Sequence, residues 1–386
     1  MIGGLRRELA SKPDDAATLR DLGFALLQRV RETADPSLYA QAEEAFDQAR
    51  RLAPRDPLVL VGIGGLQLGK HQFADALATS AAALALDPSL PSAQAARVDA
   101  LVELGRYDEA ADAEAQLISR RVDLTSLARL SYLRELHGNL EGAVATMRQA
   151  ANSPASAPEN SAYVRTLLGN LLVYVGQPDA AADAYEAALA TVPSHAAAIA
   201  GLGRLAVGRG DLPEAIRRFE AASAILPLAE YVIALGEAEE ASGDAAAAAR
   251  SYDLARAETR LFVAAGVDVD LELALFEADH GDAAKAVDLA EAAYKTRRTL
   301  RTADALAWAY HVAGRAGDAA RLSGEALRLG TRDPLLLYHG GIIAMDGGDT
   351  ATAKKRLGAA LALDPGFSAT GARAARDALT RLASSR

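Results

Sequence analysis

The sequence predicts an all-helical protein, an α-solenoid of about ten helical hairpins followed by a C-terminal capping helix. Three observations favour this fold class. Apolar residues make up 51% of the 386 residues and aromatic residues only 5%, and alanine occurs in runs, which suits closely packed helices. The alternation of β-branched and polar residues that is typical of strands is absent. A short glycine-containing turn recurs along most of the chain.

The spacing of this turn predicts the hairpins. It occurs in segments such as ELGRYDEAA and ADHGDAAKA, and successive turn glycines are 33 to 38 residues apart. These glycines are Gly105, Gly138, Gly176, Gly210, Gly243, Gly281, Gly314 and Gly348. A period near 34 residues is typical of a helix–turn–helix repeat. Two further units precede the first of these turns, and in the second of them His71 replaces the glycine.

Other positions repeat in step with the turn. A small residue follows each glycine five positions later, and a larger side chain often follows four positions after that, as at Tyr185, Phe219 and Tyr252. Small residues let the two helices of a hairpin touch, and the larger one fills the space beside the next hairpin. A proline then often ends the second helix, as at Pro193, because proline cannot continue it.

Together these positions resemble the tetratricopeptide repeat superfamily over nearly the whole chain. We expect one solenoid spanning residues 1–386, with repeats at 16–55, 57–90, 91–123, 124–154, 162–195, 196–228, 229–258, 267–297, 300–332 and 334–366, and a capping helix at 367–384. The resemblance implies a right-handed superhelix whose first helices line a concave groove. The C-terminal repeats are also similar to uncharacterised bacterial members that are often exported or lipid-anchored.

Composition excludes several classes. A net charge of −10 and a pI near 5.2 argue against a nucleic-acid-binding protein, which needs a basic face. No apolar run approaches the ~18 residues that cross a membrane. The chain has no cysteine, so disulfides and thiolate chemistry are excluded. The sequence leaves open a cytoplasmic location, or an extracytoplasmic one if a leader was removed.

Candidate binding residues follow from the resemblance, which implies that fixed positions of each first helix face the groove. Aromatic residues stand at several of these positions beside isolated polar residues, a combination suited to contact with a peptide or ligand. The candidates are Tyr132, Tyr163, Asn170, Arg204, Glu237, Asp304, Trp308 and Tyr338. The alternative is that each packs between neighbouring first helices. The carboxylate-binding clamp of chaperone-binding relatives is not recognisable.

Histidine chemistry is expected to be minor. His280 stands between Asp279 and Asp282, but Asp282 is placed to cap the next helix and His280 is predicted to face water. A pairing of His311 with His339 is conceivable, yet a metal site wants three or more converging ligands.

The sequence therefore predicts a non-enzymatic scaffold that binds an unidentified protein or peptide in its groove, without a cofactor, a metal or a catalytic residue. The alternatives are an extracytoplasmic small-ligand binding protein and a self-assembling structural array.

Overall fold

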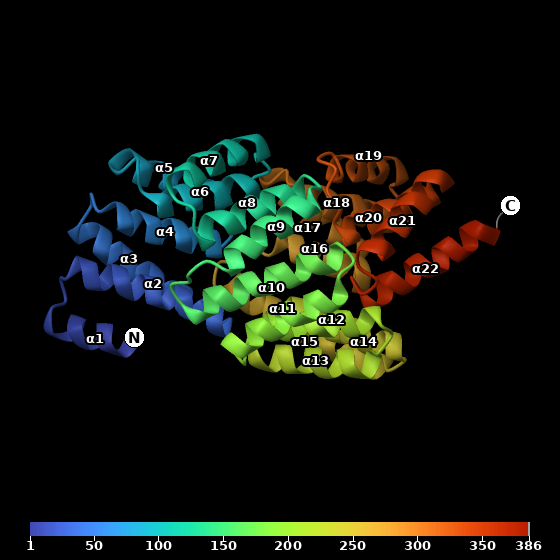
Figure 1. Ribbon diagram of the computed structural model, residues 1–386, viewed down its shortest axis with the longest axis horizontal. Helices are drawn as coiled ribbons and strands as arrows, with labels where there is room; N and C mark the ends of the chain where they lie inside the picture. The colour runs from blue at the N-terminus through green and yellow to red at the C-terminus, as the bar shows by residue number, and fades with distance from the viewer. Residues whose placement is uncertain (385–386) are drawn as a thin grey trace. The chain divides into compact units, whose positions relative to one another are not determined.

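The computed structural model describes residues 1–384, which form 22 helices and no strand (Figure 1). The helices are α1 (Ile2–Ser11), α2 (Ala16–Thr33), α3 (Leu38–Leu52), α4 (Pro57–Gly69), α5 (Phe73–Leu86), α6 (Pro91–Glu103), α7 (Tyr107–Arg120), α8 (Leu124–Leu136), α9 (Leu140–Ala151), α10 (Pro158–Tyr174), α11 (Pro178–Thr191), α12 (Ala196–Gly208), α13 (Leu212–Ile225), α14 (Ala229–Ser242), α15 (Ala245–Ala264), α16 (Asp270–His280), α17 (Ala283–Thr296), α18 (Leu300–Val312), α19 (Ala316–Ala326), α20 (Pro334–Asp346), α21 (Thr350–Leu363) and α22 (Ala369–Ser384). None of the helices in residues 1–384 is both long and apolar enough to cross a membrane.

The helices pair in chain order, α2 with α3 and so on to α20 with α21, which confirms the predicted fold class of about ten hairpins with a final helix. The sequence did not lead us to expect α1. The chain divides into two compact units, which we describe separately. Unit 1 comprises residues 1–122 and 259–269, and unit 2 comprises residues 123–258 and 270–386. Whether the whole chain acts as one solenoid with the predicted repeat boundaries stays a prediction.

In each unit one hairpin packs on the next through a large ring seated between two glycines. In unit 1 the fully buried ring of Phe46 on α3 lies against Gly23 and Gly62, and in unit 2 the buried ring of Tyr185 on α11 lies against Gly169 and Gly201. A Cβ atom on any of these four glycines would clash with the ring. The glycines therefore let three successive helices close around one aromatic side chain.

Most of the turns between paired helices share one backbone conformation. Of the eight predicted turn glycines, all except Gly281 have a φ angle between 71° and 93°. His71 adopts the same region at 59°, and its Nδ1 lies 2.6 Å from the carbonyl oxygen of Asp268 in unit 1, a hydrogen bond that offsets the strain of a non-glycine residue there. At Gly281 a side chain would clash with the Glu277 carboxyl, so this glycine leaves room for a neighbour.

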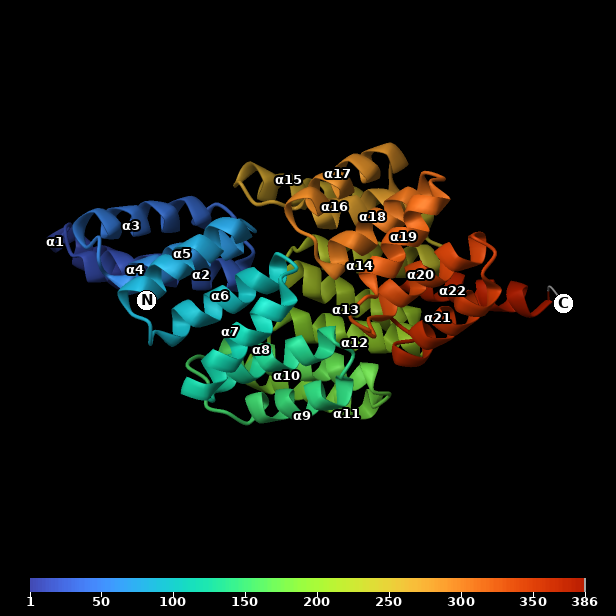
Figure 2. The ribbon, with the colours of Figure 1, turned by 90° about the horizontal axis from the view of Figure 1, so that it is seen from above.

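Within unit 2 the first helices of neighbouring hairpins contact one another, as α16 does with α18 and α18 with α20 (Figures 1 and 2). The end of the chain also returns to helices far earlier in the sequence. Helix α22 contacts α14, and the Ser368 hydroxyl donates to Glu237 Oε2 at 2.7 Å. The backbone at Gly366 packs directly on the carbonyl of Arg204 in α12. These long-range contacts bring α12, α16, α18 and α20 around a common interior.

Candidate functional site

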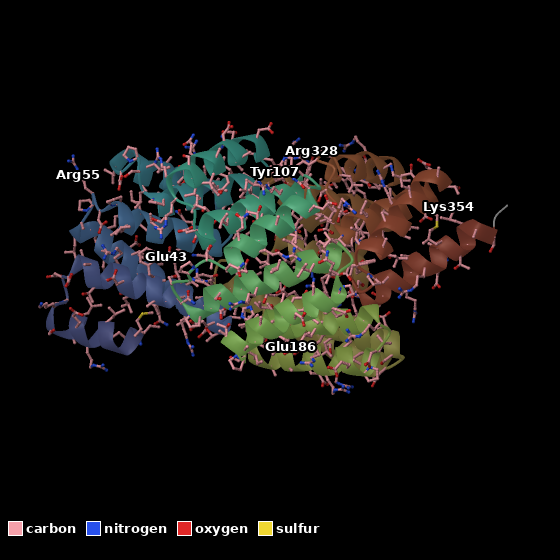
Figure 3. The ribbon with its side chains drawn as sticks, viewed as in Figure 1. Glu43, Arg55, Tyr107, Glu186, Arg328 and Lys354 are labelled. Carbon is pink, nitrogen blue, oxygen red and sulfur yellow. The ribbon has the colours of Figure 1, made fainter. Side chains whose placement is uncertain are left out.

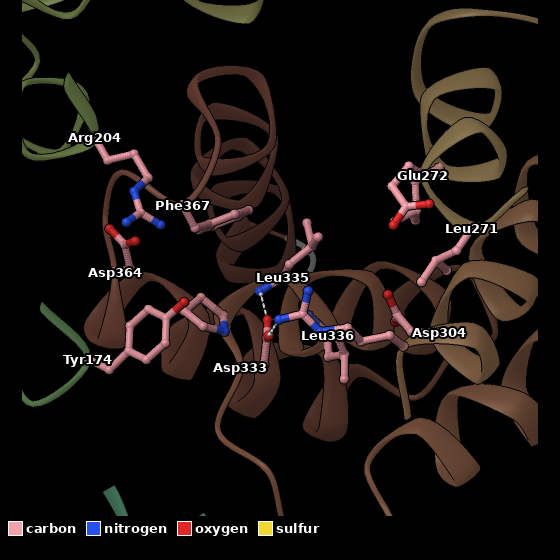
Figure 4. Close-up of a pocket in the computed structure, with 13 residues that line it drawn as sticks. Tyr174, Arg204, Leu271, Glu272, Asp304, Asp333, Leu335, Leu336, Asp364 and Phe367 are labelled. Atoms are coloured by element: carbon pink, nitrogen blue, oxygen red, sulfur yellow. Dashed lines mark hydrogen bonds and ion pairs between the residues drawn. The ribbon is translucent and has the colours of Figure 1, made fainter. Parts of the chain in front are cut away.

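A cavity of about 250 Å³ lies in this interior of unit 2 (Figure 4). We call it the unit 2 cavity. Leucines and Phe367 form its apolar wall. Its polar lining consists of Tyr174, Arg204, Glu272, Arg301, Asp304, Asp333 and Asp364. Four carboxyl groups and two guanidinium groups therefore face the same small space.

Asp333 is fixed at one side of the cavity by the start of α20. Its Oδ1 accepts hydrogen bonds from the backbone N–H groups of Leu335 and Leu336, at 2.9 and 3.3 Å, so it caps that helix. The guanidinium of Arg301 lies 3.9 Å from Asp333 Oδ2 (Figure 4). Helix capping and this ion pair together hold both side chains at the cavity wall.

Arg204 is held at another side by a hydrogen-bonded group. The Tyr185 hydroxyl donates to Asn170 Oδ1 at 2.8 Å, and the Arg204 guanidinium donates to the same oxygen. Figure 4 shows this guanidinium pointing toward Asp364. Burial raises the pKa of the Asp364 carboxyl, and Arg204 offsets part of that rise. The sequence placed Asn170 and Arg204 among the candidates, and the structure brings them into contact.

Asp304 links the cavity wall to a buried cluster behind it, which contains Trp308 and His339. His339 Nδ1 lies 2.7 Å from Asp304 Oδ2, and the His339 ring stacks on Trp308 with centroids 4.3 Å apart. The Trp308 indole N–H donates to Asp279 Oδ1 at 2.7 Å. Burial raises the pKa of Asp304. Burial lowers the pKa of His339, but the neighbouring Asp304 carboxylate outweighs it and the net shift is upward.

His311 joins this cluster without forming a metal site. Its ring stacks on Trp308 with centroids 5.0 Å apart, and its Nε2 lies 3.5 Å from Asp346 Oδ2. Tyr338, whose side chain is also buried, lies 5.3 Å from Phe367 between ring centroids, which links the cluster to the cavity wall. In the described part of the chain no group of three or more His, Cys, Asp or Glu side chains is placed to hold a metal ion.

The prediction that His280 faces water is wrong. Its side chain is only 9% exposed, its ring stacks on Tyr252 at 4.2 Å, and its Nε2 lies 3.6 Å from Glu237 Oε1. Tyr252 belongs to the preceding hairpin, so a neighbouring repeat covers the turn. The capping role predicted for Asp282 is confirmed, since its Oδ1 accepts from the backbone N–H of Lys285 at 2.9 Å.

Three more carboxyls have a raised pKa, two of them coupled electrostatically to the cavity lining and one, Asp279, bonded to Trp308. Glu230 and Asp279 remain accessible to solvent, yet burial raises the pKa of both. Burial, together with the negative charge of Asp333, raises the pKa of Glu135 to about 7. Among the described residues, no ion pair is formed by Glu135, Glu230 or Glu272.

The predicted groove residues thus divide into three groups. Arg204 and Asp304 line the unit 2 cavity, while Trp308, Tyr338, Glu237 and Asn170 pack or hydrogen-bond behind it. Tyr163 on α10 is 53% exposed and Tyr132 on α8 is partly buried, and neither lines the cavity.

Sequence reasoning missed several lining residues, chiefly Tyr174, Glu272, Arg301, Asp333, Asp364 and Phe367. Asp333 and Asp364 each precede a proline in a loop, outside the helix positions that the resemblance singles out. The sequence signal that could have pointed to these two aspartates is the proline that directly follows each of them.

Helix pairs stacked in chain order, with an interior lined by their first helices, define an α-solenoid repeat protein. The tetratricopeptide repeat family model matches residues 35–91, 62–123 and 166–230. These residues carry tetratricopeptide repeats, and the chain resembles the tetratricopeptide repeat superfamily. Members of this superfamily serve in general as scaffolds for protein–protein interaction.

Two curated relatives are both cellulose synthase operon protein C. The chain is 28% identical to the protein of Xanthomonas axonopodis pv. citri over 361 residues, which is 88% of this chain and 20% of that protein. It is 29% identical to that of Pseudomonas fluorescens over 161 residues, 39% of this chain and 12% of that protein. The chain therefore spans at most a fifth of the length of these relatives.

The solved structures that are similar to the chain have low sequence identity to it. The human IFIT1 dimer with PPP-AAAA is 14% identical with a TM-score of 0.49, covering 89% of this chain and 85% of that one. PilW, a type IV pilus biogenesis factor, is 19% identical with a TM-score of 0.44, covering 52% of this chain and 92% of that one.

Proposed function

We propose that the chain is a non-enzymatic scaffold that holds a partner protein or peptide against the first helices around the unit 2 cavity. The observation that carries the proposal is the cavity itself, because side chains of three different first helices, Arg204, Glu272 and Asp304, meet there. Concave sites with a mostly apolar wall and a few fixed polar groups are typical binding sites.

The arrangement of the polar groups supports binding over catalysis. Asp333 is committed to capping α20, and Asp304 is hydrogen-bonded to His339. The His339 and His280 rings are stacked on aromatic side chains and largely buried. A general acid or base needs a proton-transfer atom within reach of a substrate, and these rings are enclosed by the fold.

Selection of binding peptides tests the proposal. We expect a random-peptide phage library to yield peptides that bind the full chain. Hydrogen–deuterium exchange should then show slower exchange in α12, α16, α18 and α20 when such a peptide is bound. Peptides that leave these helices unchanged and protect another surface would contradict the proposed position of the site. A library that yields no binder would contradict peptide binding altogether.

A second candidate function is the binding of a small ligand. The volume of about 250 Å³ favours it, since this space suits a small molecule or one side chain rather than a long segment. Native mass spectrometry of the gently purified chain distinguishes the two candidates. A co-purifying mass that is lost on partial unfolding supports the small ligand, and its absence together with a peptide binder supports the scaffold. Self-association stays a prediction that light scattering over a concentration series would test.

A further inference from the structure

The charge around the unit 2 cavity is unbalanced. Six carboxyl groups line it or interact electrostatically with its lining: Glu135, Glu230, Glu272, Asp304, Asp333 and Asp364. Against them stand the guanidinium groups of Arg204 and Arg301 and, when protonated, the His339 ring. Six potential negative charges therefore face at most three positive ones. Carboxyls crowded in this way disfavour ionisation of one another, and a bound cation would relieve that cost.

The positive groups are already engaged by particular acceptors. Arg301 faces Asp333, and Arg204 hydrogen-bonds to Asn170 while it points toward Asp364. Glu272 has no such partner within residues 1–384. The uncompensated negative charge is therefore on the side of the cavity where α16 and α18 meet, away from Arg204.

Asp304 gives an independent indication of a missing partner. Its side chain is 4% exposed, and its Oδ2 is bound to His339 Nδ1. No further hydrogen bond reaches this carboxyl within the described residues, so Oδ1 is left without one. Figure 4 shows the Asp304 carboxyl pointing into the open space toward Glu272. A carboxylate oxygen that lacks a donor and points into a cavity can accept a hydrogen bond from a ligand there.

The apolar wall restricts what kind of cation would fit. Leu271 and Leu275 flank Glu272 on α16, and Phe367 adds an aromatic ring to the lining. Lysine and arginine side chains combine an aliphatic stem, which packs on apolar surface, with a cationic head that needs carboxylates. A metal ion would leave the leucine wall unused, and a wholly apolar group would leave Glu272 and Asp304 Oδ1 without a donor.

We propose that the unit 2 cavity receives a lysine or arginine side chain of the bound partner. The stem lies against Leu271, Leu275 and Phe367, and the cationic head lies between Glu272 and Asp304. This inference rests on the proposed function, because the side chain is carried by the partner segment. It specifies the chemistry that the scaffold recognises.

The main variant for the test is Glu272→Gln, which removes one negative charge from an exposed, unpaired side chain. The matched control is Glu186→Gln, which makes the same change on an exposed residue of α11 outside the cavity (Figure 3). Asp304→Asn is added only after circular dichroism shows unchanged helix content, because Asp304 also holds His339.

Two probes keep the inference separate from the proposed function. The first is the phage-selected peptides and their analogues with lysine or arginine replaced by norleucine. The second is Nα-acetyl-lysine methylamide with its norleucine counterpart, which tests the cationic group without a peptide. Binding is followed by calorimetry and by the emission of Trp308, which stacks on the ring bonded to Asp304.

We expect selected peptides to be rich in lysine or arginine. Norleucine replacement and Glu272→Gln should each weaken binding roughly tenfold, and Glu186→Gln should leave it unchanged. Peptides that bind at the cavity without a basic residue would overturn the inference and leave the proposed function standing. If no peptide binds, but the lysine amide binds the wild type and not Glu272→Gln, the cation site stands and the scaffold proposal fails. If neither probe binds, both are overturned.

Discussion

Both units contain carboxyl groups with a lowered pKa, such as Asp15 in unit 1 and Asp349 in unit 2, but among the described residues only unit 2 contains carboxyl groups whose pKa is raised by burial. In the described part of unit 1, Asp15, Asp87 and Glu109 have a lowered pKa, because each accepts local hydrogen bonds at a helix end or from a nearby arginine. In unit 2, burial raises the pKa of Glu135, Glu230, Asp279, Asp304 and Asp364. Carboxyls of the first kind stabilise the fold, whereas those of the second kind cost stability.

This difference indicates which carboxyl groups of a repeat protein mark a binding site. A carboxyl that caps a helix is stabilised by the hydrogen bonds it accepts from the backbone of that helix. A carboxyl whose ionisation is disfavoured by its surroundings occurs at sites of function more often than elsewhere. The carboxyl groups of the chain are therefore of two kinds, and only those with a pKa raised by burial, which occur in unit 2, point toward a ligand.

The largest expected effect tests whether the two units share their packing. Phe46→Ala in unit 1 and Tyr185→Ala in unit 2 should each lower the free energy of unfolding by about 3–5 kcal/mol, since each removes a fully buried ring. Urea denaturation followed by circular dichroism measures this. Tyr185→Phe should cost about 1 kcal/mol through loss of the hydrogen bond to Asn170. If Tyr185→Phe costs nothing, the polar link of unit 2 is dispensable.

A smaller effect, of opposite sign in the two units, depends on pH. The pKa of Glu135 is raised to about 7, so its ionisation in the folded state costs stability as pH rises from its ordinary pKa of 4.5 through about 7. Glu135→Gln should therefore stabilise the protein by roughly 3 kcal/mol at most at about pH 8, and have little effect at about pH 4.

The control for Glu135 is Glu109→Gln in unit 1. The pKa of Glu109 is lowered by its hydrogen bond from Arg106, so this carboxylate adds stability above its ordinary pKa and loses it as pH falls. Glu109→Gln should consequently destabilise the protein at neutral pH. Denaturation midpoints at several pH values follow both variants. If Glu135→Gln and Glu109→Gln change the denaturation midpoint in the same direction above neutral pH, the contrast between these two carboxyls is contradicted.

The smallest effect is spectroscopic. A protonated imidazole quenches an indole stacked on it, and both His339 and His311 stack on Trp308. The pKa of His339 is raised through Asp304 despite burial, and burial lowers that of His311. Trp308 emission should thus rise in two steps, one below and one above the ordinary histidine pKa of 6.5. His311→Phe should remove the lower step and His339→Phe the upper one. A single step that survives both changes would contradict the assignment.

The hairpins could be predicted from the sequence because their determinants are local. A turn glycine such as Gly176, the alanine five residues later and the large ring of Tyr185 are set by one repeat and its neighbour. The predicted capping aspartate Asp282 is equally local. His280 was misassigned because the side chain that covers it, Tyr252, comes from the preceding hairpin.

The cavity could be predicted only in part. Arg204 and Asp304 stand at inward positions of their helices, which the repeat pattern specifies. Asp364 and Phe367 reach the cavity because the backbone at Gly366 packs on Arg204, a contact between hairpins far apart in the sequence. No sequence pattern within a single repeat predicts a contact between hairpins so far apart in the chain. The acid-rich lining was therefore not visible before the structure.

The hydrogen bond between Ser368 and Glu237, and the contact of α22 with α14, change how unit 2 responds to truncation. In an open array each repeat touches only its neighbours, so terminal repeats can be removed one at a time and stability falls in steps. Here removal of α22 would expose α14 as well as α21. Closing such a long segment of chain also slows folding, because the loop entropy is lost before the contact forms. Loss of α22 should accordingly destabilise unit 2 more than loss of a terminal repeat destabilises an open array.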